Sequence, residues 1–430
     1  GNALVDMYAK CGVLAKACQV LKQLPVQSVV SWNALIAGYV QQGQGFKALN
    51  CFEQMQSEGI TPDEITLIST LKACCGTGAM EKGKKIHDEI ISRDLLKKDI
   101  VLGATLMNMY AKYGMLAKAQ QVLEELPVRD VVVWNVLIGG YAQQGQCHEA
   151  LNYFSWNQKE GLLPDEVTFI CILNACGKAG AIDKGKQIHN EIIKRGLLEN
   201  NLMLGNGLVD MYVKCGMLVK AQEALEELPT RDVVSWNSLI AGFAQHGHSH
   251  EALNCFEWMQ CEGLCPDEVT CLCILTVCSH SGLLDEGEVI FANMTTKYGI
   301  IPNLEHHTCM IAILGCAGHF DKALRAIKAM TSSSYATIWV TLLGACSRWG
   351  NVKLAKLAFD HAVYLDKTCA AAYILMANMF AALGMQEEAE NIEALRLKSA
   401  VWEDYENSLR RCNFMKLSRK NGGAIESSSG

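Results

Sequence analysis

The sequence has no cysteine pattern typical of a metal or redox site. It contains 20 cysteines, but no two of them are three positions apart, so the C-x-x-C spacing is absent. The spacings most similar to it are C-x-C at Cys271 and Cys273 and C-x₃-C at Cys261 and Cys265. Many cysteines lie in apolar helical stripes, where a thiol packs as a small hydrophobic group. We therefore expect reduced cysteines in a packed core, with no metal and no cofactor.

Positive charge and long apolar runs are also scarce. The net charge is −7, which argues against a nucleic-acid binder that depends on phosphate contacts. The uncharged stretch 269–284 contains Thr, Ser and His, and it is too short and too polar to cross a bilayer. Half of the chain is hydrophobic and 19% is charged, which predicts a folded chain with a substantial core. Only the last residues, 409–430, are predicted to be disordered.

One apolar stretch with a Trp-Asn pair occurs three times at a fixed spacing. It spans residues 29–39, 131–141 and 233–243. Trp134 lies 134 − 32 = 102 residues after Trp32, and Trp236 lies 236 − 134 = 102 residues after Trp134. A constant register over three copies indicates a repeat array. Because Gly1 falls inside a repeat and no targeting segment precedes it, we expect the natural N-terminus to be missing, so localisation is left open.

Turn signals divide each period into three unequal units. Leu-Pro and Pro-Asp-Glu sequences end helical stripes at regular positions. The predicted units are 1–28 (truncated), 29–63, 64–99, 100–130, 131–165, 166–201, 202–232, 233–267, 268–303 and 304–335. Within each, two apolar stripes of helical period meet at a short break, and Gly12, Gly114 and Gly216 mark left-handed helix ends. The pattern predicts an all-α chain of stacked helical hairpins.

Several motifs resemble those of one plant family. The short units carry Asp6-Met-Tyr-Ala-Lys-Cys-Gly12 and Asp210-Met-Tyr-Val-Lys-Cys-Gly216, and the longest units carry G-K-x-I-H at 83–87 and 185–189. With S-W-N and unit lengths of 35, 36 and 31, residues 1–335 resemble the PLS class of pentatricopeptide repeat (PPR) proteins. The resemblance implies a right-handed α-solenoid superhelix of helix-turn-helix repeats, with 304–335 as its terminal short motif.

The remaining chain resembles the C-terminal extension of the same family. Residues 336–369, with Trp339 to Cys346, are similar to the E1 repeat, and residues 370–408, with Tyr373 to Asn378, are similar to E2. Both are expected to be hairpins of tetratricopeptide type. The end of the E2-like part departs from the family at 402–408, which puts its docking role in question. By this resemblance we expect a member of the family that lacks the DYW deaminase domain.

No catalytic constellation is predicted. His87-Asp-Glu89 and His189-Asn-Glu191 match the H-x-E of zinc deaminases, but no P-C-x-x-C follows, and the third copy has Phe291. The Gly-Lys pairs at 83–84 and 185–186 lack the rest of a P-loop. The pair His306-His307 has no further ligands and is expected to be structural. We expect a protein that is not an enzyme.

Polar residues at matched positions are the better candidates. Asn33, Asn135 and Asn237 occupy the fifth position of the 35-residue units, and Asp63, Asp165 and Asp267 occupy the last. Short units vary the pair as Asn206 with Asp232 and Asn2 with Ser28. Stacked hairpins would place these residues along one face, where amides and carboxylates can bind the edges of unpaired bases.

Helix capping is the alternative for the Asp row. An Asp two or three residues before an apolar stripe is a good N-cap, worth about 1 kcal/mol relative to Ala. Capping explains the Asn row less well, because the Trp-Asn pair already lies within the stripe, where Asn has a poor helix propensity.

The resemblance adds a base code to these positions. Asn with Asp implies uridine for 29–63, 131–165, 202–232 and 233–267, and Asn with Ser implies a pyrimidine for 1–28. Ala104 with Asp130 implies a permissive unit, and the base for Thr308 with Tyr335 is uncertain. The 36-residue units have Ile68, Ile170 and Leu272 at the fifth position and are expected to select little. At the second position, Val30, Val132 and Val234 are expected to clamp bases.

By family implication the chain binds one single-stranded RNA in a mitochondrion or chloroplast and specifies a site of C-to-U editing. A DYW-type deaminase would act in trans, together with other editing-factor proteins, and no membrane or small-molecule partner is expected. Three alternatives stay open at this point. The chain could serve RNA splicing, stability or translation, it could be a protein-binding scaffold, or it could be a decaying paralogue.

Overall fold

The computed structural model describes residues 1–199, 201–330 and 335–398. Within these residues the chain forms helices joined by short loops, without strands. It divides into two compact bodies, Gly1–Arg231 and Asp232–Gly430. We call them the N-terminal and the C-terminal body. The predicted disordered tail at 409–430 and the divergent segment 402–408 lie outside the described residues.

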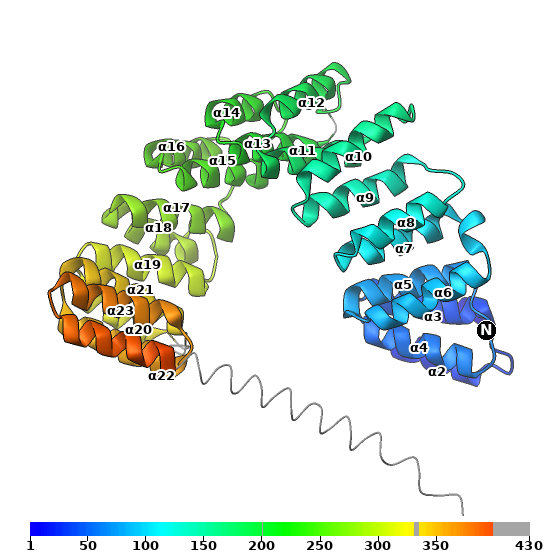
Figure 1. Ribbon diagram of the computed structural model, residues 1–430, viewed down its shortest axis with the longest axis horizontal. Coiled ribbons are helices and arrows are strands. Elements are labelled where there is room, and N and C mark those ends of the chain that lie inside the picture. Colours follow the sequence, from blue (N-terminus) through cyan, green and yellow to red (C-terminus); the bar gives the residue numbers. More distant parts are fainter. Residues whose placement is uncertain (200, 331–334, 399–430) are drawn as a thin grey trace, which may run out of the picture. The chain divides into compact units, whose positions relative to one another are not determined.

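The described residues of the N-terminal body, 1–199 and 201–231, form seven consecutive helical hairpins. Their helices are α1 (Asn2–Lys10), α2 (Leu14–Gln23), α3 (Val29–Gln41), α4 (Gly45–Ser57), α5 (Glu64–Thr77), α6 (Met80–Ser92), α7 (Ile100–Lys112), α8 (Leu116–Glu125), α9 (Val131–Gln143), α10 (Cys147–Lys159), α11 (Glu166–Ala179), α12 (Ile182–Lys194), α13 (Leu202–Lys214) and α14 (Leu218–Glu226). A short 3₁₀ helix, η1 (Leu95–Lys97), follows α6. Figure 1 shows the hairpins in chain order.

The C-terminal body continues the same architecture. It contains α15 (Val233–Gln245), α16 (Ser249–Cys261), α17 (Glu268–Ser281), α18 (Leu284–Thr296), α19 (Leu304–Cys316), α20 (Phe320–Ala329), α21 (Ala336–Trp349), α22 (Val352–Leu365) and α23 (Ala370–Ala382). Residues 386–398 are helical up to the end of the described chain. Each body is therefore an α-solenoid, which confirms the predicted fold class.

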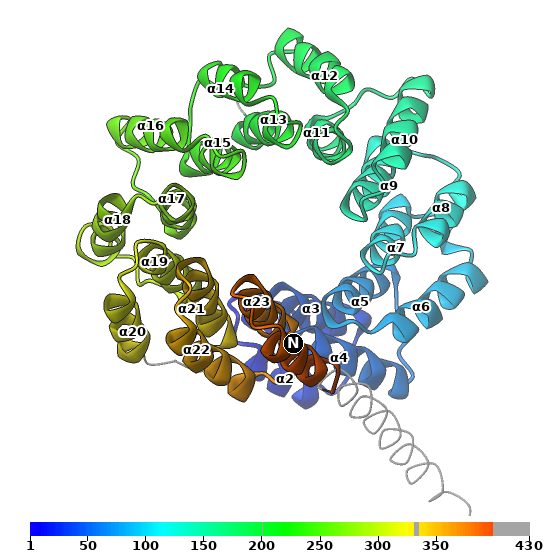
Figure 2. The same cartoon turned by 60° about the vertical axis from the view of Figure 1, so that its left-hand side comes forward.

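Each body has two layers of helices. The first helices of successive hairpins pack on one another, as α3 does on α1 and α5, and each also packs on the second helix of its own hairpin. In Figure 2 the odd-numbered helices form the inner row of each body and the even-numbered helices form the outer row. The first helices are consequently the most buried part of the chain, and Trp32, Leu35 and Ile36 have almost no exposed surface.

Glycines end helices and let neighbouring helices approach. Gly12, Gly114 and Gly216 follow α1, α7 and α13 with φ between 71° and 79°, the left-handed conformation predicted for them. Gly140 lies inside α9 instead, where an added Cβ would come within 2.9 Å of the Ala111 Cβ on α7. A larger residue there would separate the first helices of two adjacent units.

At one core position the unit 131–165 holds a polar residue where the other two 35-residue units hold methionine. Asn157 of α10 is fully buried, and neither its amide nitrogen nor its amide oxygen has a hydrogen-bond partner. The equivalent positions one period away on either side hold Met55 and Met259, which are also fully buried. An unpaired buried amide costs free energy because its hydrogen bonds to water are lost on folding. The unit 131–165 therefore contains a local destabilising substitution.

Candidate nucleic-acid interface

Each 35-residue unit builds the same three-residue hydrogen-bonded group. Asn33 of α3 donates from Nδ2 to the Asp63 carboxylate, with a nitrogen–oxygen distance of 2.9 Å, and accepts from the Thr66 hydroxyl at 2.5 Å. The equivalent distances are 2.8 and 2.7 Å around Asn135, and 2.9 and 2.6 Å around Asn237. We call these groups the Asn–Asp–Thr triads. Their members are Asn33, Asp63 and Thr66; Asn135, Asp165 and Thr168; and Asn237, Asp267 and Thr270.

The aspartate of each triad also caps the next first helix. Asp63 accepts from the Thr66 backbone N–H at 2.8 Å, and the Thr66 hydroxyl accepts in return from the Asp63 backbone N–H, which completes a capping box on α5. Asp165 on α11 and Asp267 on α17 make the same box. The capping role considered for the Asp row is thus present, and it is combined with the bond to Asn.

The triad carboxylates are held in their ionised form. Burial by itself raises the pKa of Asp63, but the hydrogen bonds from Thr66 and Asn33 outweigh it and leave the pKa below its usual value. The pKa of Asp165 and that of Asp267 are lowered against burial in the same way. At neutral pH each carboxylate therefore only accepts hydrogen bonds, while the neighbouring amide can still donate.

In the short units the fifth and last positions hold other residues or make other contacts. Asn2 donates to the Ser28 hydroxyl at 2.9 Å, and Ser28 caps α3. Ala104 is buried in α7. Asp130, the last residue of the same unit, caps α9, and it has no Asn at the fifth position to bond with. Asn206 lies in α13 and Asp232 is the N-cap of α15, so these two belong to different bodies. In α19, Thr308 donates to the backbone oxygen of Leu304.

A row of exposed apolar side chains follows the second position of consecutive units. Val30, Val132 and Val234, the expected clamp residues, are each more than half exposed. The same is true of the second residue of the neighbouring units, which the sequence interpretation omitted, namely Ile65, Val101, Val167, Met203 and Val269. The signal was available, since all of them occupy one position of the repeat. Glu305 ends the row in the next unit.

Comparison with known proteins places these features in a family. The PPR repeat family matches at residues 27–76, 129–178 and 231–280, and single PPR repeats match at 105–131, 167–197, 206–233 and 305–335. The chain belongs to the PPR family. The matches cover most of the N-terminal body and less than half of the C-terminal body, and each Asn–Asp–Thr triad lies inside one of the three longer matches.

Curated PPR proteins of Arabidopsis thaliana align with nearly the whole chain. One pentatricopeptide repeat-containing protein is 36% identical over 92% of this chain. Another, named mitochondrial, is 36% identical over 91%, and CRR2, named chloroplastic, is 35% identical over 91%. The aligned region amounts to 48%, 45% and 60% of these relatives, so this chain spans about half of their length.

Solved PPR structures share the fold. PPR10 in complex with an 18-nt psaJ RNA element superposes with a TM-score of 0.74 at 19% identity, covering 93% of this chain and 60% of PPR10. PPR10 from maize superposes with a TM-score of 0.55 at 21% identity, covering 91% of this chain and 62% of the other. At these identities the likeness concerns the fold.

The histidines of the H-x-E motifs pack against tyrosines in this PPR protein. The Nδ1 atom of His87 lies 2.7 Å from the Tyr110 hydroxyl, and that of His189 lies 3.0 Å from the Tyr212 hydroxyl. Burial lowers the pKa of both imidazoles. His306 completes the capping box of α19 through Asn303. Over the described residues, no group of His, Cys, Asp or Glu side chains is arranged to hold a metal ion, and no helix could span a membrane.

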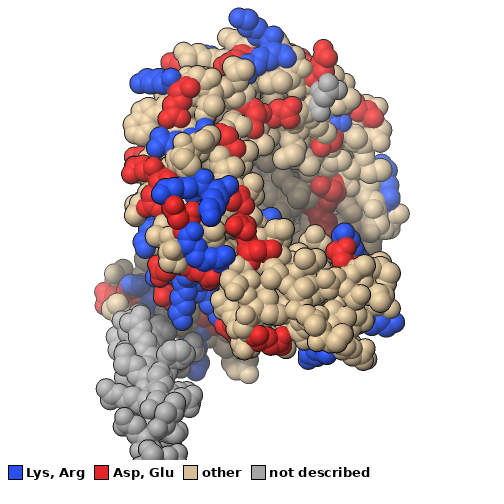
Figure 3. All heavy atoms as spheres, turned by 90° about the vertical axis from the view of Figure 1, so that its right-hand side faces the viewer, with Lys and Arg blue, Asp and Glu red and all other residues tan. Residues whose placement is uncertain are grey.

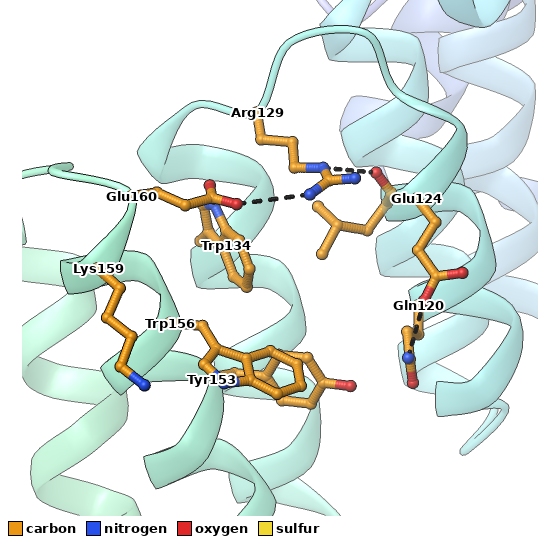
Figure 4. Close-up of a pocket in the computed structure, with 9 residues that line it drawn as sticks. Gln120, Glu124, Arg129, Trp134, Tyr153, Trp156, Lys159 and Glu160 are labelled. Carbon is orange, nitrogen blue, oxygen red and sulfur yellow. Dashed lines mark hydrogen bonds and ion pairs between the residues drawn. The ribbon is translucent and has the colours of Figure 1, made fainter.

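A cavity of about 260 Å³ opens between α8 and α10. Figure 4 shows Trp134, Tyr153 and Trp156 on one side of it and Arg129 with Glu160 at its rim. The polar groups at the rim bind each other, because Glu160 accepts from the Trp134 indole at 3.2 Å and lies 3.4 Å from the Arg129 guanidinium. These contacts tie one unit to the next and leave little polar capacity for a ligand.

Charges of both signs are mixed on the surface. Figure 3 shows Lys and Arg interspersed with Asp and Glu, and uncharged side chains between them, on the face that it presents. This distribution agrees with the net charge of −7 and provides no continuous basic surface on that face.

Proposed function

We propose that this PPR protein binds single-stranded RNA and selects one base per reading unit through its Asn–Asp pairs. The observation that carries the proposal is the repeated bond between Asn Nδ2 and the Asp carboxylate. After this bond and the Thr bond are made, each pair retains one amide N–H as a donor and carboxylate lone pairs as acceptors. Uracil offers the complement, since its O4 accepts and its N3–H donates. Cytosine offers a donor and an acceptor in the opposite order.

The exposed apolar row supports the same proposal. Side chains such as Val132 and Val167 are more than half exposed at the second position of adjacent first helices, which otherwise bury most of their apolar residues. Apolar groups beside a donor–acceptor pair suit the flat faces of a splayed base, and proteins recognise single-stranded RNA by this combination. Because few phosphates are neutralised, the affinity should depend only modestly on salt.

The finer assignment concerns the biological role. We infer a PLS-class protein that specifies an organellar C-to-U editing site and relies on a deaminase supplied in trans. Three features support the assignment. The units alternate in length as 35, 36 and 31 residues, further helices (α21–α22, and α23 with residues 386–398) follow where the E1-like and E2-like repeats are expected, and relatives carry mitochondrial or chloroplastic names.

The test of RNA selection uses the purified chain and a random pool of single-stranded RNA. The wild-type protein should enrich uridine at several spaced positions. Asp165→Asn should shift one of these positions from uridine toward cytidine, because the new amide donates where the carboxylate accepted. The melting temperature should change little, since Asn caps a helix about as well as Asp. Enrichment without any base preference would contradict the proposal.

The test of the editing role uses plants that lack the gene. Conversion of C to U should disappear at one or a few organellar positions that lie beside the sequence selected in vitro. Altered splicing or transcript abundance with all conversions intact would instead assign the protein to another step of RNA processing. Capture of a protein partner by a chain that selects no RNA would favour a scaffold.

A further inference from the structure

The third residue of each unit varies with the fifth residue of the unit before it. Wherever the fifth position is Asn, this following residue carries a hydroxyl, as in the pairs Asn2 with Ser31, Asn33 with Thr66, Asn135 with Thr168, Asn206 with Ser235 and Asn237 with Thr270. Wherever the fifth position is another residue, the hydroxyl is absent, as in Ile68 with Leu102, Ala104 with Val133, Ile170 with Leu204, Leu272 with His306 and Thr308 with Ile338. Some requirement links the two positions.

Helix capping does not supply that requirement. Asp130 caps α9 through the backbone N–H of Val133 at 3.0 Å, and Asp99 caps α7 through Leu102 at 3.2 Å. Neither Val133 nor Leu102 has a hydroxyl, so the cap forms without one. In the triads the backbone bond to the cap is equally present, for example from Thr168 to Asp165 at 2.8 Å. In the triads the hydroxyl also accepts from the backbone N–H of the capping Asp at 3.1 to 3.3 Å and lies 2.7 to 2.9 Å from its carboxylate. These contacts involve only the cap and not the fifth position, so the link between the two positions must be explained by the hydroxyl's other contact, which lies outside the cap.

The other contact is the bond to the Asn amide oxygen. In each triad the Thr Oγ1 lies 2.5 to 2.7 Å from Asn Oδ1, while Asn Nδ2 lies 2.8 to 3.0 Å from the Asp carboxylate. The Asn side chains are only 7% to 8% exposed, so water cannot easily replace either partner. Two different partners on the two ends of one amide fix which end faces which neighbour and restrict rotation about its last bond.

We propose that Thr66, Thr168 and Thr270 are positioning residues for base selection, each holding the amide of the preceding unit so that its remaining N–H stays available to the base. The proposal rests on the proposed function of the Asn–Asp pairs and adds a third position to it. The base would contact Asn and Asp, and the threonine would act only through the Asn amide.

Serine at this position makes a different bond. The Ser31 hydroxyl donates to the backbone oxygen of its cap residue, Ser28, at 2.7 Å, and Asn2 of that unit is exposed. Serine lacks the methyl group that restricts the threonine side chain to few rotamers. A serine in place of a triad threonine should therefore hold the amide less firmly and give an intermediate base preference.

The experiment measures base preference by selection from a random 20-nucleotide single-stranded RNA pool, with variants of the full chain. Asn135→Ala first identifies the nucleotide selected by the unit 131–165, as the one whose uridine preference disappears. At this nucleotide Thr168→Val should lower the uridine-to-cytidine ratio about three- to tenfold, the range expected for one lost hydrogen bond. Thr168→Ser should lie between Thr168→Val and wild type.

Controls separate positioning from folding. Val133→Thr adds a hydroxyl where Ala104 offers no amide and should leave the preference unchanged at every nucleotide. In the Asn135→Ala background, Thr168→Val should cause no further loss of preference, because its effect passes through Asn135. If Thr168→Val does not fold, Thr66→Val and Thr270→Val provide the same test at their own nucleotides.

The outcomes are distinguishable. A Thr168→Val protein with the wild-type ratio, in a chain whose Asn135→Ala variant loses its preference, would overturn the positioning role and leave the Asn–Asp proposal standing. A lower melting temperature with an unchanged ratio would show a structural role alone and would also overturn it. A wild-type chain without base preference would overturn both proposals together.

Discussion

Units 100–130 and 131–165 are neighbours in the N-terminal body, and their first helices, α7 and α9, pack on each other. Both are helical hairpins, and each ends in an Asp that caps the next first helix. The first unit has Ala104 where the second has Asn135, and across the junction that follows each unit Val133 stands where Thr168 stands after the second. The caps are alike, and only the second unit forms a hydrogen-bonded group across the junction.

The difference shows that an Asp at the last position of a unit can act as a helix cap alone, so under our proposal the Asp row by itself does not define a base-selecting unit. Asp130 caps α9 just as Asp165 caps α11, although the fifth position of its own unit holds Ala104 and not an Asn. Capping and base recognition are not exclusive, since Asp165 bonds to the Thr168 backbone and to Asn135 at the same time. The Asn and the hydroxyl are the residues that separate the two kinds of unit.

The largest effect should come from Asn157, which stands in the unit 131–165 where the other two 35-residue units have methionine. Asn157→Met replaces an unpaired buried amide with the residue that its copies use, and it should raise the free energy of unfolding by about 1–3 kcal/mol. Urea unfolding measures the change. The matched control Gln158→Met alters the exposed neighbour and should have almost no effect. Equal stability of Asn157→Met and wild type would contradict the unpaired state of Asn157.

The Asn and the hydroxyl that the unit 100–130 lacks can be introduced by mutation. Ala104→Asn with Val133→Thr builds a triad on the existing Asp130, and the unit 100–130 should gain a uridine preference of about five- to tenfold, the value of roughly one added hydrogen bond. Selection from the random RNA pool measures it as a newly specified nucleotide next to the one of the unit 131–165. Ala104→Asn alone should gain less. No new specified nucleotide in the double variant would show that the triad is insufficient.

The smallest effect is expected from replacing the capping aspartates, Asp130 and Asp165. Asp130→Ala and Asp165→Ala each remove an N-cap, and each should lower the free energy of unfolding by about 1 kcal/mol. Only Asp165→Ala should change the base preference, because of these two aspartates only Asp165 accepts from an Asn amide, that of Asn135 in its own unit. Thermal unfolding and RNA selection on the same preparations test both parts. A change of preference in Asp130→Ala as well would mean that the cap itself shapes the RNA contact.

Much of the fold followed from periodicity. The spacing of Trp32 and its copies, the Leu-Pro stops and the glycines at helix ends led to helical hairpins, because these signals are local and each acts within one turn of its own position. The fifth and last positions were also identifiable, since polar residues interrupt apolar stripes there. The row of exposed apolar residues at the second position was predicted only in part. Ile65, Val101 and Met203 are of residue types that usually lie in the core, and it is their orientation on the folded helices that exposes them.

The sequence by itself determined that this chain is a helical repeat array and which polar positions recur in it, because helix period, caps and turns depend on neighbouring residues. Only the tertiary structure decided that Thr66, Thr168 and Thr270 belong to the preceding Asn, since each of these bonds joins residues 33 positions apart. Residues so distant meet only when one hairpin stacks on the next. The complete Asn–Asp–Thr triad is therefore a product of the junction between repeats and exists in no single repeat.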